Sequence, residues 1–224
     1  MESTVSAEVR ESMAHATWYF DFVSPFAYLQ WQRIRVMSQQ ATFALRPVLF
    51  AGLLDRHGQK GPAEIPSKRL FTYRFVYWRA RQQGVTLNFP PAHPFSPLAA
   101  LRLCVAAGSS AVAVDAIFNH LWRDGLRGDS AESLTEVSGR LGFVDAVEAI
   151  GSTEVKNALR ENFDAAVADK VFGVPTIVMD GHMFWGDDAT AMFEAYLEDP
   201  EMFATSEMAR LENLPVGKHR RASE

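Results

Sequence analysis

The chain has 224 residues, of which 48% are hydrophobic, which is enough to bury a substantial core in one domain or in one domain with an insertion. Its net charge of -5 argues against nucleic acid or an anionic membrane as the main partner. A lone cysteine, Cys104, excludes an intrachain disulfide and a cysteine-based metal site, and it fits a reducing compartment.

Residues 1–16 form a polar segment that includes three glutamates. The segment has neither the apolar centre of a signal peptide nor the arginine-rich, acid-poor composition of a transit peptide, so we expect a flexible N-terminal extension. No apolar run approaches the ~20 residues that cross a bilayer. We therefore expect a cytoplasmic protein.

Two strands and a helix are predicted at the start of the chain. Residues 17–23, TWYFDFV, are typical of a buried strand, and Pro25 suits the first turn of the helix that follows. Residues 41–50, ATFALRPVLF, predict a second strand. A strand, a helix and a strand in this order predict a parallel pair with a crossover helix.

The middle of the chain, from about residue 66 to residue 168, has apolar residues at helical spacing and predicts a helical block. Two short strands then flank Asp180 and Gly181, a dipeptide typical of a two-residue hairpin, and a last helix follows. We expect the end of the chain, LENLPVGKHRRASE at residues 211–224, to be extended and partly exposed. This order predicts an α/β fold: a thioredoxin-like core at residues 17–50 and 169–200, an all-helical insertion at residues 51–168, and a tail at residues 201–224.

Two motifs carry a resemblance to a known family. The stretch FDFVSPFAY, and later VFGVPTIVMDGHMFWGDD, resemble the 2-hydroxychromene-2-carboxylate isomerase family, a DsbA-like branch that is similar to kappa-class glutathione transferases. The stretches RPVLFAGLL, FPPAHPFSPLAALR and RLENLPVG extend the resemblance over roughly residues 17–219. It implies a DsbA-like thioredoxin fold, glutathione as cofactor, a role in aromatic compound catabolism, and a homodimer.

Ser24 is the predicted catalytic residue. DsbA-like oxidoreductases open the matching helix with Cys-x-x-Cys, whereas this chain has Ser24, Pro25, Phe26 and Ala27, which excludes disulfide exchange through its own residues. A helix N-terminus favours an anion, including the thiolate of an external thiol. We expect the Ser24 hydroxyl to donate a hydrogen bond to the glutathione sulfur; the alternative is a plain helix N-cap.

The remaining cofactor-binding residues follow from the resemblance. It implies a cis peptide bond before Pro175, which leaves the Val174 backbone free to pair with glutathione as with an added strand; the alternative is a proline that only begins a strand. It also implies that the next segment holds the γ-glutamyl end, with one carboxylate, Asp188 rather than its neighbour, on the ammonium group. Family members often carry an arginine where this chain has Ala189. The residues implied in this segment are Trp185, Gly186, Asp187 and Asp188.

The substrate-binding residues implied by the resemblance depart from the family pattern. The family commonly has lysine at position 55 and asparagine at positions 64 and 96, and two of these changes are towards negative charge, which should repel a carboxylate. The residues at the implied site are Asp55, Glu64, Ile65 and Ser96.

A helix predicted near residues 66–82 offers further candidates. Lys68, Arg69 and Arg74 are able to compensate for the lost lysine, although a solvated basic face is the more common role of such a stripe. The aromatic residues Tyr73 and Tyr77 and also Trp78 fit the wall of an aromatic pocket, but at this helical spacing we expect them to pack in the core.

The first functional hypothesis is a glutathione-dependent cis–trans isomerase of 2-hydroxychromene-2-carboxylate type substrates, acting by reversible thiolate addition to a conjugated double bond. One alternative is a kappa-like glutathione transferase, and another is a non-catalytic thioredoxin-fold binding protein. The partners expected are glutathione and a small aromatic substrate. No metal is expected, because His57 and His93 lie in predicted loops without a second ligand at a recognisable spacing.

Overall fold

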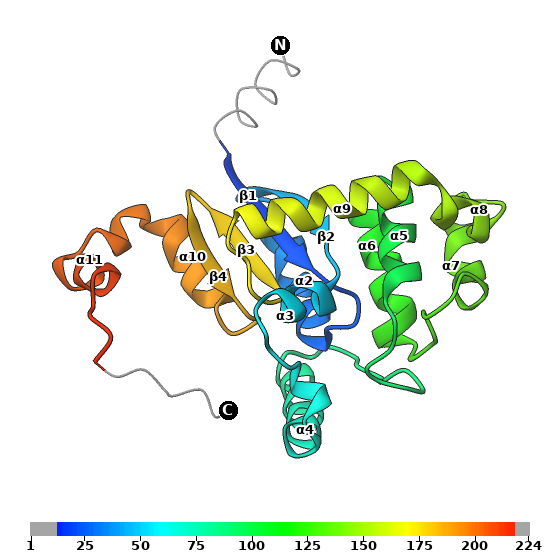
Figure 1. Cartoon of the computed structure of the whole chain (residues 1–224), viewed down its shortest axis with the longest axis horizontal. Helices are drawn as coiled ribbons and strands as arrows, with labels where there is room; N and C mark the ends of the chain where they lie inside the picture. The colour runs from blue at the N-terminus through cyan, green and yellow to red at the C-terminus, as the bar shows by residue number, and fades with distance from the viewer. Residues whose placement is uncertain (1–12, 218–224) are drawn as a thin grey trace, which may run out of the picture. The chain divides into compact units, whose positions relative to one another are not determined.

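The sheet is built from both ends of the predicted core. In the computed structural model, which describes residues 13–217, β1 (Ala14–Phe20) and β2 (Ala41–Pro47) are parallel and are joined by the crossover helix α2 (Pro25–Met37) (Figure 1). This arrangement confirms the predicted parallel pair. The predicted bounds of the first strand were wrong, because β1 starts at Ala14 and gives way to a turn after Phe20. Residues 1–12 of the expected extension lie outside the described residues.

The predicted hairpin is confirmed. Strands β3 (Thr176–Met179) and β4 (His182–Trp185) are antiparallel, and β3 pairs with β1, which gives the described sheet the order β2-β1-β3-β4. Asp180 and Gly181 have φ angles of 52° and 80°, both in the left-handed region that a two-residue hairpin turn requires. The Val174-Pro175 peptide bond directly before β3 is cis.

The helical region between β2 and β3 has two parts that differ in their surroundings. One helix, α4, lies apart from the bundle of α5 to α8, and α9 runs from this bundle along the sheet (Figure 1). The elements of the region are α3 (Phe50–Arg56), η1 (Pro62–Glu64), α4 (Pro66–Gln82), α5 (Leu98–Ala106), α6 (Ala111–Phe118), η2 (Asn119–Arg123), η3 (Glu132–Leu134), α7 (Thr135–Arg140), α8 (Ala146–Gly151) and α9 (Thr153–Ala168).

Strand β1 supplies both faces of the core, because successive side chains of a strand point to opposite sides. Trp18 stacks on Trp31 of α2 with a centroid distance of 5.6 Å, and it also meets Phe118 of α6 at 6.2 Å. Tyr19 packs on the other face in a cluster that includes Leu53 of α3 and Ala166 of α9. The strand that leads into Ser24 is therefore fixed from both sides.

The residues from Ala191 onward form a second, small unit, whereas those up to Thr190 form one compact unit that includes the helical region. The second unit contains most of α10 (Thr190–Glu198), together with η4 (Pro200–Phe203) and α11 (Ser206–Glu212), and Tyr196 stacks on Phe203 with a centroid distance of 5.5 Å. The end that the sequence predicted to be extended overlaps α11 only at residues 211 and 212. Of the rest, residues 213–217 are exposed and non-helical, and residues 218–224 lie outside the described residues. None of the helices within residues 13–217 is long and apolar enough to cross a membrane.

Candidate active site

Ser24 is the N-cap of α2 and is 8% exposed. Its Oγ accepts a hydrogen bond from the Ala27 N–H at 3.2 Å, and Pro25 occupies the first helical position. This capping bond uses an oxygen lone pair and leaves the hydroxyl proton available to a ligand. The capping role and the predicted donor role are therefore compatible, where sequence analysis had treated them as alternatives.

The turn before Ser24 is held by a buried carboxylate. Asp21 is fully buried; its Oδ1 accepts from the Val23 N–H at 3.0 Å and its Oδ2 from the Phe50 N–H at 2.8 Å. Burial raises the pKa of Asp21 to about 7, although these backbone N–H groups oppose the shift. Because Leu49, the N-cap of α3, makes no capping bond, Asp21 serves as the acceptor for the start of α3 as well as for the turn.

His93 holds the same turn from the other side. Its Nε2 lies 2.8 Å from the Val23 carbonyl oxygen, and since a carbonyl only accepts, Nε2 carries the proton. The Tyr73 hydroxyl lies 2.7 Å from both Nδ1 and the His93 carbonyl oxygen, and its one proton is shared between these two acceptors when the ring is neutral. Burial lowers the pKa of His93, which favours the neutral ring that this arrangement needs. The sequence pattern around His93 suggested only a weak candidate metal ligand and gave no sign of this structural role.

The segment predicted to bind glutathione is tied to α2. The Pro175 carbonyl accepts from the Gly186 N–H at 2.8 Å, and Gln30 of α2 donates to the Gly186 carbonyl at 2.9 Å and to Thr190 Oγ1 at 3.0 Å. The half-exposed Trp185 lies over Gly173, where an added Cβ would stand 2.6 Å from the indole nitrogen. The cis proline turn, residues 185–188 and the helix of Ser24 are thus brought together.

The two neighbouring aspartates have different environments. Asp187 is 1% exposed, and its Oδ2 lies 2.5 Å from Arg79 Nη2 of α4. Burial raises the pKa of Asp187, against the effect of Arg79 and Arg33. Asp188 is exposed. Of the two carboxylates, the one open to a ligand ammonium is therefore Asp188, and Arg79 is a site neighbour that the sequence did not indicate.

The predicted substrate residues lie on the periphery. Asp55, Glu64 and Ser96 are exposed, and Ile65 is partly buried. Glu64 is engaged locally, since its Oε1 accepts from the Gly61 N–H at 2.6 Å. Asp55 lies in α3, the helix whose start is held by Asp21, so it has an indirect structural connection to Ser24.

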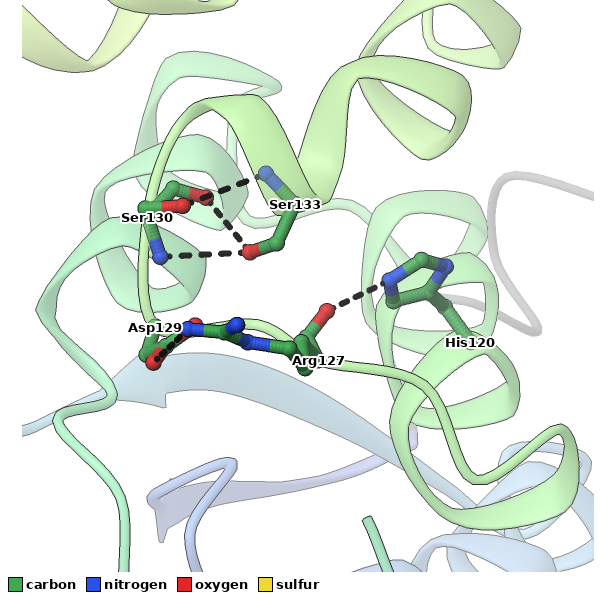
Figure 2. Close-up of polar contacts among 5 residues, drawn as sticks. All are labelled: His120, Arg127, Asp129, Ser130 and Ser133. Carbon is green, nitrogen blue, oxygen red and sulfur yellow. Dashed lines mark hydrogen bonds and ion pairs between the residues drawn. The ribbon is translucent and has the colours of Figure 1, made fainter. Parts of the chain in front are cut away.

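A second cluster contains serine, histidine and aspartate but has none of the geometry of a catalytic triad. His120 Nε2 donates to the Arg127 carbonyl at 2.7 Å, whereas Asp129 pairs with the Arg127 guanidinium at 2.9 Å (Figure 2). Ser130 and Ser133 bond to each other. Each side chain in this cluster closes the loop after η2, so its role is structural.

A groove of about 850 Å³ runs between β2, α2 and α6. None of the predicted site residues lines it. Two of its arginines are already paired, Arg35 with Asp115 and Arg123 with Asp124. The groove therefore adds no group to the candidate site.

A family model described as a DSBA-like thioredoxin domain matches residues 17–198. The 2-hydroxychromene-2-carboxylate isomerase of Pseudomonas putida is 32% identical over 189 residues, which cover 80% of this chain and 91% of that protein. The chain belongs to the 2-hydroxychromene-2-carboxylate isomerase family.

Other relatives agree with this assignment. A solved structure of a 2-hydroxychromene-2-carboxylate isomerase matches with a TM-score of 0.71 and 25% identity, over 89% of this chain and 98% of that one. Glutathione S-transferase kappa 2 of Caenorhabditis elegans is 27% identical over 205 residues, which cover 82% of this chain and 91% of that protein. The predicted DsbA-like thioredoxin fold is confirmed, and the isomerases among these proteins support the predicted isomerase class.

Proposed function

We propose that this family member is a glutathione-dependent cis–trans isomerase of aromatic substrates of the 2-hydroxychromene-2-carboxylate type. The observation that carries the proposal is the state of Ser24: its oxygen caps α2 while its proton is left available at the positive end of the helix. A thiolate sulfur placed there gains both the hydrogen bond and the helix charge. The reaction that we propose is the one for which the relatives are named, the isomerisation of 2-hydroxychromene-2-carboxylate.

The chemistry needs only a bound thiolate and an oriented substrate. The cyclic hemiketal of the substrate first opens: its ring C–O bond breaks, the hemiketal proton passes to the phenol oxygen, and a cis conjugated keto acid results. The sulfur then adds to the carbon β to the ketone, a C–S bond forms, and the π electrons move onto the ketone oxygen as an enolate. The former double bond is now single and rotates. Collapse of the enolate breaks the C–S bond and releases the trans isomer and the unchanged thiolate, so no oxidant or reductant is consumed.

The protein's own thiol is not a candidate nucleophile. Cys104 is buried in α5, and burial raises the pKa of its thiol to about 12. The thiolate, rather than the thiol, is the nucleophile, so this side chain is inert at neutral pH. An external thiol is needed, and Val174, Trp185, Gly186 and Asp188 are proposed to bind it.

The test measures the conversion of 2-hydroxychromene-2-carboxylate by absorbance in two reactions. One contains no glutathione, and the other contains glutathione at much less than one equivalent of the substrate. Isomerisation should require glutathione, and mass spectrometry should recover the cofactor unmodified. A stable conjugate, with one glutathione consumed per turnover, would assign the kappa-like transferase activity. Turnover at the same rate without glutathione, or no turnover at all, would contradict the proposal.

We also propose a cellular compartment and an oligomeric state for the enzyme. Dependence on glutathione suits a cytoplasmic protein, and the family resemblance implies a homodimer. Sedimentation velocity of the full chain measures the assembly directly, and a single species with the mass of one chain would exclude the homodimer.

A further inference from the structure

Helix α4 exposes an unusual amount of aromatic surface. Phe71, Tyr77 and Trp78 are 67%, 50% and 55% exposed. Sequence analysis expected Tyr77 and Trp78 to pack in the core, and this was wrong. Large contiguous apolar surfaces are uncommon on soluble proteins and mark binding sites.

Three aromatic rings of α4 stack in sequence, and we call them the aromatic row: Phe71, Phe75 and Trp78. Their spacing of four and three residues puts them on one face of the helix. Phe71 and Phe75 have a centroid distance of 5.7 Å and an interplanar angle of 12°, and Phe75 and Trp78 have 6.0 Å and 21°. Another planar ring can pack against such nearly parallel rings in an offset-stacked or an edge-to-face arrangement.

The aromatic row adjoins the candidate active site at two points. Phe26, two residues after Ser24, has its ring centroid 6.2 Å from that of Phe75. Arg79 lies 5.7 Å above the Phe75 ring and also pairs with Asp187. A planar ligand on the row would therefore lie next to the elements that carry both the catalytic serine and the proposed glutathione segment.

The charge of α4 fits an anionic ligand. The helix contains Lys68 and four arginines and has no aspartate or glutamate, in a protein whose net charge is -5. Lys68 and Arg74 are exposed. Cations beside a flat apolar surface suit a planar ring that bears a carboxylate, both through charge and through cation–π contact.

We propose that the aromatic row of α4 binds the planar ring of an aromatic carboxylate substrate, while the α4 cations attract its carboxylate. The proposal rests on the isomerase function above and names where its second substrate binds. It also accounts for the acidic side chains of Asp55 and Glu64, because the positive charge that a carboxylate needs is supplied by α4 instead.

The test uses 2-naphthoate, a planar aromatic carboxylate, titrated against the full chain without glutathione and followed by calorimetry. Trp78→Ser and Phe71→Ser should each weaken binding roughly 3- to 10-fold, since a lost ring contact is worth about 0.5–1.5 kcal/mol. Val147→Ser is the matched control, because Val147 is 67% exposed on α8, which neither carries the aromatic row nor lines the groove. Its affinity for 2-naphthoate should equal that of the wild type.

Two results would overturn the proposal: no binding of 2-naphthoate to the wild type, or unchanged affinity in both row variants, including the case in which these variants also convert a dimer to a monomer. That case would make the aromatic row a contact between copies. Glutathione affinity, measured on the same samples, separates the two proposals. Wild type that binds 2-naphthoate but no glutathione contradicts the proposed isomerase and leaves the aromatic row supported.

Discussion

Asp21 and Phe50 are joined by a hydrogen bond of 2.8 Å from the first N–H of α3 to a fully buried carboxylate. The other oxygen of the same carboxylate accepts from Val23, one residue before Ser24. Asp21 therefore fixes the start of the helix that bears Asp55 and the turn that leads into Ser24. A neutral side chain with a single acceptor oxygen can hold only one of them.

Asp21→Asn tests this link through the pH dependence of stability. The folded-state pKa, raised to about 7, exceeds the unfolded value of ~3.9, so the folded protein binds more protons between them and Asp21 lowers stability as pH rises through this window. Between pH 5 and 8 the wild type should lose about 2–3 kcal/mol relative to Asp21→Asn. Urea unfolding at both pH values gives the difference. A difference that is independent of pH would exclude titration of Asp21 in this range.

His93→Leu is expected to lower kcat/KM by about tenfold, because the Val23 carbonyl loses its donor and the turn at Ser24 loosens. His93→Gln retains an N–H donor and should recover part of the loss. Steady-state kinetics with His57→Leu as an exposed control measures both. Equal activity of His93→Leu and the control would show that the turn holds its shape without the ring.

The neutral ring of His93 also predicts an acid-side effect on stability. Its pKa is lowered in the folded state, so the unfolded chain binds more protons below ~6.5, and the stability contribution of His93 is lost as pH falls through the folded value. The free energy of unfolding, measured between pH 7 and pH 5, should fall more steeply with decreasing pH for the wild type than for His93→Gln. Parallel curves for the two proteins would contradict the neutral assignment.

Ser24→Ala is expected to reduce kcat/KM by about 10- to 100-fold, since one charge-assisted hydrogen bond to sulfur is lost. It also removes a helix cap, worth about 0.5–2 kcal/mol of stability. Ser110→Ala is the matched control, because Ser110 caps α6 through Ala113 at 3.3 Å and lies outside the candidate site. Thermal melts should show similar losses for both variants, and only Ser24→Ala should lose activity. An equal loss of activity in both would reduce the role of Ser24 to capping.

The two aspartates should separate binding from stability. Asp188→Ala removes an exposed carboxylate, so it should raise the Kd for glutathione about tenfold and leave the melting temperature unchanged. Asp187→Ala leaves Arg79 without its partner, which costs at most about 3–5 kcal/mol for a buried pair and less here because Arg79 is 21% exposed. Calorimetry and thermal melts on the two variants suffice. The opposite pattern would assign the ligand contact to Asp187.

Features of the site that depend on neighbouring residues were predictable from the sequence, whereas features that depend on residues far apart in the chain were not. The hairpin at Asp180 and Gly181 was predictable because two adjacent residues determine its turn. The end of β1 was not predictable, because Phe22 and Val23 continue the apolar pattern beyond Asp21. The turn at this point is stabilised by the Asp21 carboxylate, which also bonds to Phe50.

Contacts between distant residues left no local pattern. His93 and Val23 are 70 residues apart in the chain, and Arg79 pairs with Asp187 from a helix with several other arginines. Periodicity also misplaced Tyr77 and Trp78, because α4 bears apolar residues on more than one side, and spacing alone does not show which side is covered. The motif residues were predictable, and the residues that position them were not.

The bond from the Ala27 N–H to Ser24 Oγ has a consequence for which form of sulfur the site selects. With its oxygen engaged by the helix, the hydroxyl presents hydrogen to whatever lies beyond it. The sulfur of a thiol or of a thioether is only a weak acceptor, whereas a thiolate carries a full negative charge and accepts strongly. Polarity at this one hydroxyl therefore discriminates ionised sulfur from protonated and alkylated sulfur, so a glutathione molecule that has already been conjugated should leave the site more readily than the reactive anion.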